Sequence, residues 1–294
     1  MTVTLDLAGV PDVRRLTLGA AATSSKQSYT QFVTLLDIEN DSGGHLVFRT
    51  LPWNEARGWL QVHPALKQVA QGIDVLRGIR PPEERFHEFP GHVPDSVGSL
   101  GEHAPVVLAA AGDAGLESVN EWLGRIGVKL SIVPRGDAFE ILAAGRGGER
   151  VNLLDSGTGV AHVLPLVVAV RLARRRPALL CLEQPELHLH PRAHVEVADL
   201  LLESLAQHPE TKLLVETHSD VLVLRIRRAI AERRLSPGDV GIYFVEDGEE
   251  GSQVRPIELN DRATPDWWPE GIFAEPQREY FAIRRALAKR DGAA

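Results

Sequence analysis

The sequence predicts an α/β fold in which a parallel sheet is flanked by helices and preceded by a mixed, β-rich part. Ala178–Leu182 and Lys212–Val215 are short, mainly apolar runs, typical of strands buried on both faces. Helical patterns follow them at Pro191–Leu205 and Val221–Arg234, and Gly241–Val245 is a third strand-like run. This strand–helix–strand–helix–strand order predicts a parallel sheet with right-handed crossovers.

The first 105 residues predict a partial N-terminal lobe that is rich in strands. Val13–Leu18, Phe32–Ile38 and His45–Thr50 have the composition of short strands. Gly78–His103 is rich in Pro and Gly, which predicts a long ordered loop or an interdomain crossing.

Residues 106–150 predict a helix followed by a hairpin. Gly115–Ile126 carries apolar residues at helical spacing. Two strand-like runs, Lys129–Val133 and Phe139–Leu142, flank the turn Pro134–Asp137.

Composition and charge restrict the class of protein. The 294 residues allow one large or two modest domains, and a net charge of -8 argues against bulk non-specific binding of nucleic acid. The single cysteine, Cys181, excludes an intrachain disulfide. No apolar run approaches the ~20 residues of a membrane span, and the N-terminus lacks the features of a signal peptide. We therefore expect a cytoplasmic protein without membrane contact.

Two groups of arginines could face DNA, but we interpret them as solvated helix ends. They are Arg171 with Arg174–Arg176, and Arg225 with Arg227 and Arg228.

Carboxylates follow the two predicted parallel strands. Glu183-Gln184-Pro185-Glu186 comes after the first strand, and Glu216-Thr217-His218-Ser219-Asp220 comes after the second. The carboxyl ends of parallel strands meet at one sheet edge, where such folds place their chemistry. The alternative is that Glu183 and Glu216 cap helices, with Thr217 and Asp220 forming a capping box.

A glycine-containing turn opens the third region, residues 151–294, which we assign to the core. Asp155-Ser156-Gly157-Thr158-Gly159 immediately precedes the apolar helix Val160–Arg175. Two glycines let backbone N–H groups approach an anion, and the helix N-terminus adds positive potential. Alone, such a sequence is read as an ordinary tight turn; the acids that follow about 24 residues later make an anion site a second interpretation.

Together these segments resemble an ABC-class ATPase head of the branch that contains SMC and DNA-repair ATPases and OLD nucleases. The resemblance is strongest to AAA-type bacterial ATPases that carry EQPELHLHP, many of them found beside defence systems. Its motifs are LLDSGTGVAHVLPLVVAV for the signature helix, ALLCLEQPELHLHP for the Walker B strand and D-loop, and LLVETHSD for the switch loop. It covers Val151 to about Phe273 and extends more weakly back to Arg80.

The resemblance implies Mg²⁺ and ATP as ligands and assigns roles by position. Glu183 would hold Mg²⁺ through water, Gln184 takes the position of the usual catalytic Glu, and Glu186 could supply the base instead. An amide cannot accept a proton from water but can orient it. The residues implied to act at the interface with a partner chain, or on the γ-phosphate, are Ser156, Gly157, Gly159, His190 and His218.

The sequence departs from this family in lacking the phosphate-binding loop G-x-x-x-x-G-K-[ST]. Gly19–Lys26 is the nearest candidate, but it has no second Gly before Lys26, and Gln27 replaces the Ser or Thr. We interpret it as a surface loop. The chain then corresponds to the C-terminal two-thirds of such an ATPase: a truncated gene, a divergent pseudo-ATPase or half of a split enzyme. Hydrolysis would need a Walker A motif from another chain or from a missing N-terminal segment, within a homo- or heterodimer formed through the nucleotide.

Two other functions stay open. A metallohydrolase could use His188, His190 and His194 with the neighbouring acids Glu183 and Asp220 and with His218. Alternatively, a catalytically inactive interaction or regulatory subunit could keep the ABC fold, since the P-loop is absent and Gln184 replaces the usual acid.

Overall fold

The computed structural model describes six segments in full and four further strands by their backbone alone. The segments are residues 72–81, 83–89, 91–172, 178–248, 251–269 and 279–285. Two units are distinguished, Met1–Ser219 and Asp220–Ala294, and each is considered separately. Three features of the sequence interpretation, Lys26, Arg174–Arg176 and Phe273, lie outside the described residues.

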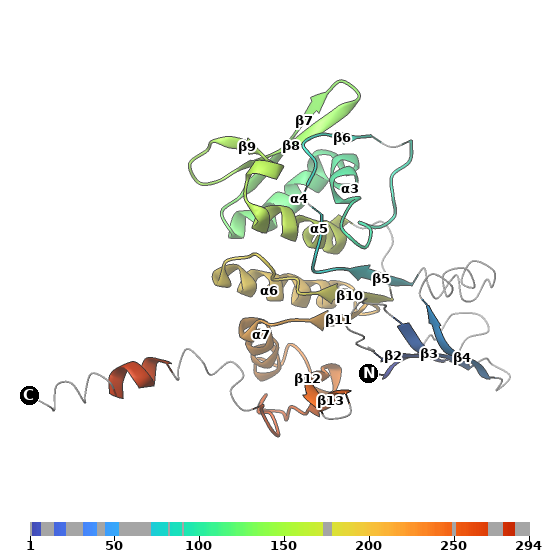
Figure 1. Cartoon of the computed structure of the whole chain (residues 1–294). Helices are drawn as coiled ribbons and strands as arrows, with labels where there is room; N and C mark the ends of the chain where they lie inside the picture. The colour runs from blue at the N-terminus through green and yellow to red at the C-terminus, as the bar shows by residue number, and fades with distance from the viewer. Residues whose placement is uncertain are drawn as a thin grey trace, which may run out of the picture. The chain divides into compact units, whose positions relative to one another are not determined.

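The N-terminal strands form an antiparallel sheet in the order β1-β2-β3-β4 (Figure 1). Their bounds are Thr2–Asp6, Arg15–Ala21, Phe32–Glu39 and His45–Pro52. The three strands predicted in this region are therefore confirmed. β2 contains Gly19–Ala21, so the first three residues of the segment expected to be a surface loop are strand instead. β2 pairs with β1 and β3.

A three-stranded parallel sheet carries the strand-end acids, as predicted. It consists of β5 (Ile73–Leu76), β10 (Leu179–Glu183) and β11 (Lys212–Glu216), in the order β11-β10-β5. α6 (Pro191–Gln207) connects β10 with β11, which makes a βαβ unit. Apolar side chains of β10 and α6, among them Leu182 and Val197, belong to one buried core.

The third strand of this sheet is not the one that the sequence suggested. Gly241–Val245 was expected there, but β12 (Ile242–Gly248) pairs antiparallel with β13 (Gly251–Ile257). β5 takes the place on the other side of β10. Its four residues, IDVL, include an aspartate and are too short to show a periodic pattern.

Four helices of the first unit form a connected layer. α5 (Thr158–Leu172) contacts α3 (Ala104–Ala110), α4 (Gly112–Arg125) and α6. α5 has no polar face over its middle turns, where every residue from His162 to Val168 is buried. A helix that is apolar on all sides is a central helix of the core.

A second antiparallel sheet joins this helical layer. Its strands are β6 (His87–Glu88), β7 (Lys129–Arg135), β8 (Ala138–Ala144) and β9 (Arg150–Asn152), with β8 between β6 and β7 and also paired with β9. This confirms the predicted hairpin. Asn120 fastens α4 to β7, because its amide donates to the Leu130 carbonyl at 2.9 Å and its Oδ1 accepts from the Leu130 N–H at 2.6 Å.

The second unit contains α7 (Asp220–Ala231), a short 3-10 turn η2 (Pro237–Asp239) and the β12–β13 hairpin. Trp267 packs on the hairpin: its indole N–H donates to the Pro256 carbonyl at 2.7 Å, and the Arg255 guanidinium lies 3.6 Å from its ring centroid. None of the described helices in either unit is both long enough and apolar enough to cross a membrane.

Candidate functional site

The loops after β10 and β11 are joined at the carboxyl edge of the parallel sheet. The parallel register places Glu183 beside Glu216. The Gln184 backbone N–H donates to the Glu216 carbonyl at 2.8 Å, and its side-chain amide donates to Glu216 Oε1 at 3.3 Å. Gln184 adopts a φ of +44°, a left-handed conformation that is uncommon for residues other than glycine. The amide at position 184 therefore has a structural partner.

Glu186 connects these two loops from inside the protein. Its side chain is only 6% exposed. Oε1 accepts hydrogen bonds from the Thr217 hydroxyl at 2.7 Å and from the His218 backbone N–H at 2.9 Å. Oε2 is buried and has no hydrogen-bond partner among the described residues. The structure thus brings Glu183, Gln184, Glu186 and the His218 backbone to one edge. The Thr217 hydroxyl donates to Glu186, and its oxygen accepts from the Ser219 N–H at 3.0 Å.

Within the signature loop, the three predicted residues have different surroundings. The Ser156 hydroxyl donates to the Leu153 carbonyl at 2.8 Å. Gly157 is exposed, has a φ of +93° and has open space where a Cβ would be. A Cβ on Gly159 would lie 2.8 Å from the His188 carbonyl oxygen. Gly157 therefore leaves room for an approaching anion, whereas Gly159 allows α5 to pack against the loop after β10.

His190 is exposed and caps α6. Its Nδ1 accepts a hydrogen bond from the Arg192 N–H at 3.2 Å, and Pro191 occupies the first helical position. Its neighbour His188 has a φ of +62° and meets His162 of α5 edge to face, with 5.1 Å between the ring centroids.

The histidines of the metallohydrolase interpretation do not converge. His194 lies 2.9 Å from the Ser219 hydroxyl and 3.3 Å from the Leu189 carbonyl, so both its ring nitrogens have protein partners. Within the parts of the chain that the structure describes, no three His, Cys, Asp or Glu side chains are grouped as metal ligands would be.

Arg80 belongs to the site, although sequence reasoning gave it no role. It follows β5, and Gly78, two residues earlier, donates its N–H to Glu183 Oε2 at 3.2 Å. Arg80 Nη1 donates to the His162 carbonyl, and Nε donates to the Arg77 carbonyl at 2.8 Å. The available sequence signal was weak, since it was one basic residue in a Pro- and Gly-rich loop.

Burial dominates the pKa values of two groups here. Desolvation, together with the charges of the nearby Arg80 and His188, lowers the pKa of His162 to about 4. Desolvation also raises the pKa of Glu83 to about 7, although the charge of Arg80 opposes this. His162 is therefore neutral at neutral pH, and Glu83 is only partly ionised.

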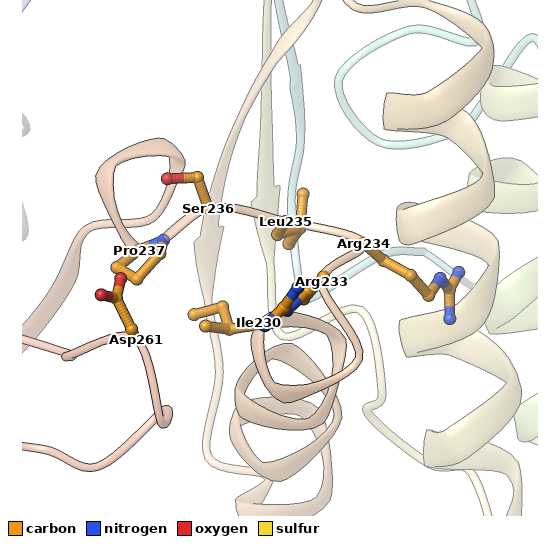
Figure 2. Close-up of a pocket in the computed structure, with 7 residues that line it drawn as sticks. All are labelled: Ile230, Arg233, Arg234, Leu235, Ser236, Pro237 and Asp261. Atoms are coloured by element: carbon orange, nitrogen blue, oxygen red, sulfur yellow. The ribbon is translucent and has the colours of Figure 1, made fainter.

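Two hollows are lined by residues that are distant in sequence from the loops after β10 and β11. One, of about 490 Å³, is lined by residues of α7 and the segment after it, together with Asp261 (Figure 2). Figure 2 shows the Arg234 side chain directed away from Pro237 and Asp261. The other, of about 450 Å³, is lined by the end of α4 and the β7–β8 region. Neither includes a residue that the sequence assigned to the site.

The parallel sheet, the acids at its carboxyl edge and the glycine turn before α5 define an ABC-type, ATPase-like domain. The chain belongs to the family described as "AAA domain, putative AbiEii toxin, Type IV TA system", which matches residues 57–225, more than half of the 294 residues. The predicted family and fold class are therefore confirmed.

Solved structures of SMC heads are similar to this chain. A structure described by "ATP-driven dimerization and DNA stimulated activation of SMC ATPases" is 17% identical, with 52% of this chain and 88% of that chain covered and a TM-score of 0.38. The SMC head domain from Thermotoga maritima is 11% identical over 83% and 75%, with a TM-score of 0.38. An SMC head bound to the C-winged helix domain of ScpA is 14% identical over 88% and 74%, with a TM-score of 0.47. At these identities the likeness concerns the fold alone. No curated protein matches the chain.

Proposed function

We propose that this domain is an ABC-type ATPase head that takes part in binding Mg-ATP at the carboxyl edge of its parallel sheet. The observation that carries the proposal is the register of Glu183 beside Glu216, which brings the two acid-containing loops together. Parallel α/β sheets bind ligands at this edge.

The donor set fits a nucleotide with its metal ion. Mg²⁺ prefers carboxylate oxygens and water. Glu183 ends β10 and has one oxygen held by the Gly78 N–H, which leaves the other for a metal-bound water. Bound Mg²⁺ would neutralise charge on the phosphates. Gln184 would orient the attacking water through its amide, and His218 would contact the terminal phosphate.

Glu186 has a different role from the general base considered in the sequence. Its Oε1 already accepts two hydrogen bonds from the switch loop, and its side chain is buried. We assign it the positioning of the His218 backbone.

The glycine turn before α5 would complete a site on a second subunit. Gly157 is exposed and unobstructed, and the N-terminus of α5 adds positive potential there. We propose that Ser156 and Gly159 shape this loop through their contacts within the chain, and that His190 lies at the same interface. The working state is then a dimer formed through the nucleotide.

The given sequence contains no G-x-x-x-x-G-K-[ST] motif, and we propose that the phosphate-binding loop is supplied in trans or by a further segment. A separate P-loop-bearing polypeptide or a preceding segment would provide it. The description of the matched family names a toxin of a type IV toxin–antitoxin system, and we propose a bacterial defence role on that basis. A non-hydrolysing regulatory subunit is the second candidate, favoured by the amide of Gln184.

The proposal is tested by steady-state ATPase assays of the purified chain, alone and mixed with a P-loop polypeptide encoded next to it. We expect negligible turnover alone, turnover in the mixture, and loss of that turnover with Ser156→Arg or Glu183→Ala. Ser252→Arg, on exposed β13, is the matched control. Unchanged turnover with Ser156→Arg would contradict the composite site. Robust turnover by the chain alone, lost with Glu183→Ala, would contradict the proposal that the chain needs a phosphate-binding loop from another source.

A further inference from the structure

The Arg80 guanidinium is held in a fixed direction by two backbone carbonyls. Nε donates to the Arg77 carbonyl at 2.8 Å, and Nη1 donates to the His162 carbonyl on α5. A guanidinium is planar and presents its donors in a rigid fork. With these two groups engaged, Nη2 has no hydrogen-bond partner among the described residues and can donate to another group.

The charge of Arg80 is poorly compensated. The side chain is partly buried, and no ion pair connects it to a carboxylate of the described residues. Glu83 and Glu183 are the acids whose charges act on it, but burial raises the pKa of Glu83 to about 7. Desolvation lowers the pKa of Arg80 itself to about 10, so it is still protonated at neutral pH. A partly desolvated cation without an ion-pair partner is unfavourable, and an incoming anion would offset part of that cost.

The position of Arg80 indicates which anion this would be. Gly78 packs on the end of β10: its N–H bonds to Glu183 Oε2, and a Cβ there would lie 3.1 Å from the Glu183 carbonyl oxygen. In the sheet order β11-β10-β5, Arg80 leaves β5 on the side of β10 opposite to β11. Arg80 thus follows the strand that pairs with β10 and bonds to α5, the helix that begins at the glycine turn.

We propose that Arg80 binds a phosphate group of the nucleotide in cis, beside Glu183, through its free Nη2 donor. This inference rests on the proposed function and adds a phosphate-binding residue to it. Charge-assisted bonds from arginine to phosphate are stronger than neutral hydrogen bonds, and the partly buried position strengthens them. The residue would supply part of the positive charge that a P-loop lysine provides in other nucleotide sites.

A purely structural role makes a different prediction. Pro165 lies inside α5, where its ring disturbs the hydrogen bonds of the preceding turn, and Arg80 could simply satisfy the His162 carbonyl in that turn. Replacing it would then lower stability but leave phosphate binding by the folded protein unchanged. The two roles are separated by measuring binding and unfolding on the same variants.

The experiment is isothermal titration of the full chain with inorganic tripolyphosphate and, in parallel, with Mg-ATP at pH 8. Arg80→Met removes the charge and keeps the volume, and we expect it to weaken binding of both ligands about ten- to a hundredfold. Arg80→Lys keeps the charge without the fork and should give an intermediate loss. Arg77→Met, at an exposed arginine three residues away, should bind like the wild type. Far-UV circular dichroism verifies that each variant is folded.

A second variant keeps the inference testable if Arg80→Met does not fold. Glu83→Gln removes the acid that opposes an anion near Arg80, and at pH 8 it should tighten tripolyphosphate binding severalfold. Wild-type affinity in folded Arg80→Met, or in Glu83→Gln, would overturn the role of Arg80, and so would a wild-type chain that binds no tripolyphosphate. If tripolyphosphate binds through Arg80 but ATP does not bind, the phosphate site stands and the nucleotide function fails. If ATP binds equally well to the wild type and to Arg80→Met, the nucleotide function stands and the role of Arg80 fails.

Discussion

The His218 backbone N–H donates to Oε1 of the buried Glu186 at 2.9 Å, and this bond ties the switch loop to the loop after β10. The Thr217 hydroxyl donates to the same oxygen at 2.7 Å. A carboxylate that accepts two such bonds resists displacement, because hydrogen bonds to charged groups contribute more than neutral ones. Glu186 is therefore a fixed point from which the His218 main chain is positioned.

Replacing Glu186 should destabilise the protein, and the size of the loss should depend on whether the new side chain can still accept hydrogen bonds from Thr217 and His218. Glu186→Ala leaves two donors without their acceptor and should lower the free energy of unfolding by about 2–3 kcal/mol. Glu186→Gln keeps an acceptor oxygen but buries an amide with no partner at the Oε2 position, so about 1–2 kcal/mol is expected. Urea denaturation measures both values.

A double-mutant cycle that combines Glu186→Ala with Thr217→Val measures the contribution of the Thr217–Glu186 hydrogen bond separately from other effects of each substitution. The coupling energy between positions 186 and 217 should be about 1–2 kcal/mol. Glu117→Ala, at an exposed position on α4, serves as the control and should change stability by less than about 0.5 kcal/mol. Additive effects at positions 186 and 217 would show that the hydrogen bond contributes nothing to folding.

The glycines of the signature loop should respond to substitution for different reasons. Gly159→Ala places a Cβ 2.8 Å from the His188 carbonyl oxygen, so we expect a loss of about 1–3 kcal/mol. Gly157→Ala meets no atom but must hold a φ of +93°, which should cost about 1–2 kcal/mol. Thermal and chemical denaturation give both changes.

Gly124 provides the matched control, since it lies within α4, has open space at its Cβ position and needs no positive φ. Gly124→Ala should raise stability by about 0.5–1 kcal/mol. Gly159→Ala behaving in the same way would mean that α5 and the loop after β10 are not in close contact.

His162 should make stability depend on pH below neutrality. Its folded-state pKa is about 4, whereas an unfolded histidine titrates near 6.5, so between these values the unfolded chain binds the extra proton. Stability should therefore fall as pH decreases from about 6.5 to 4, by up to about 3 kcal/mol from this group. Denaturation at several pH values, compared between wild type and His162→Gln, isolates the contribution. His92→Gln, an exposed histidine, should keep the wild-type slope.

The sequence was informative where a pattern was long or chemically specific. α4, α6, β10 and β11 were predicted within a few residues because their apolar patterns are regular. Glu183 and Glu216 were predicted to meet because parallel strands end at the same edge, and their register confirms it. The β12–β13 hairpin was misassigned because a strand pattern alone carries no information about its pairing partner.

Contacts between distant residues could not be predicted in the same way. Arg80 and His162 are 82 residues apart, and the bond between them depends on how the loop after β5 packs against α5. The contact of Gly159 with the His188 carbonyl likewise follows from packing of two loops, whereas the sequence shows only a glycine in a turn. The burial of Glu186 was also hidden, since the motif EQPELHLHP contains four other polar or charged residues.

Gln184 provides the last prediction, because its amide donates to Glu216 Oε1 at 3.3 Å. Gln184→Glu would restore the usual acid of this motif, but it also replaces a hydrogen bond with two facing carboxylates. The pair is partly exposed, so we expect a modest loss of about 0.5–1 kcal/mol at pH 7. The repulsion raises the folded-state pKa of the carboxylate pair, so the loss should shrink as the pH falls toward 4 and grow as the pH rises.

Exchanging the two side chains tests whether the Gln184 amide is required because it faces the Glu216 carboxylate. In the double variant Gln184→Glu/Glu216→Gln the amide donates from the other position, so stability at pH 7 should return to within about 0.3 kcal/mol of the wild type. Glu216→Gln alone should be close to neutral, because one amide can still donate to the other. If Gln184→Glu is as stable as the wild type at every pH, the amide is not maintained by Glu216. Its presence would then have to be explained by the chemistry of the bound nucleotide, through the orientation of water that we propose for it.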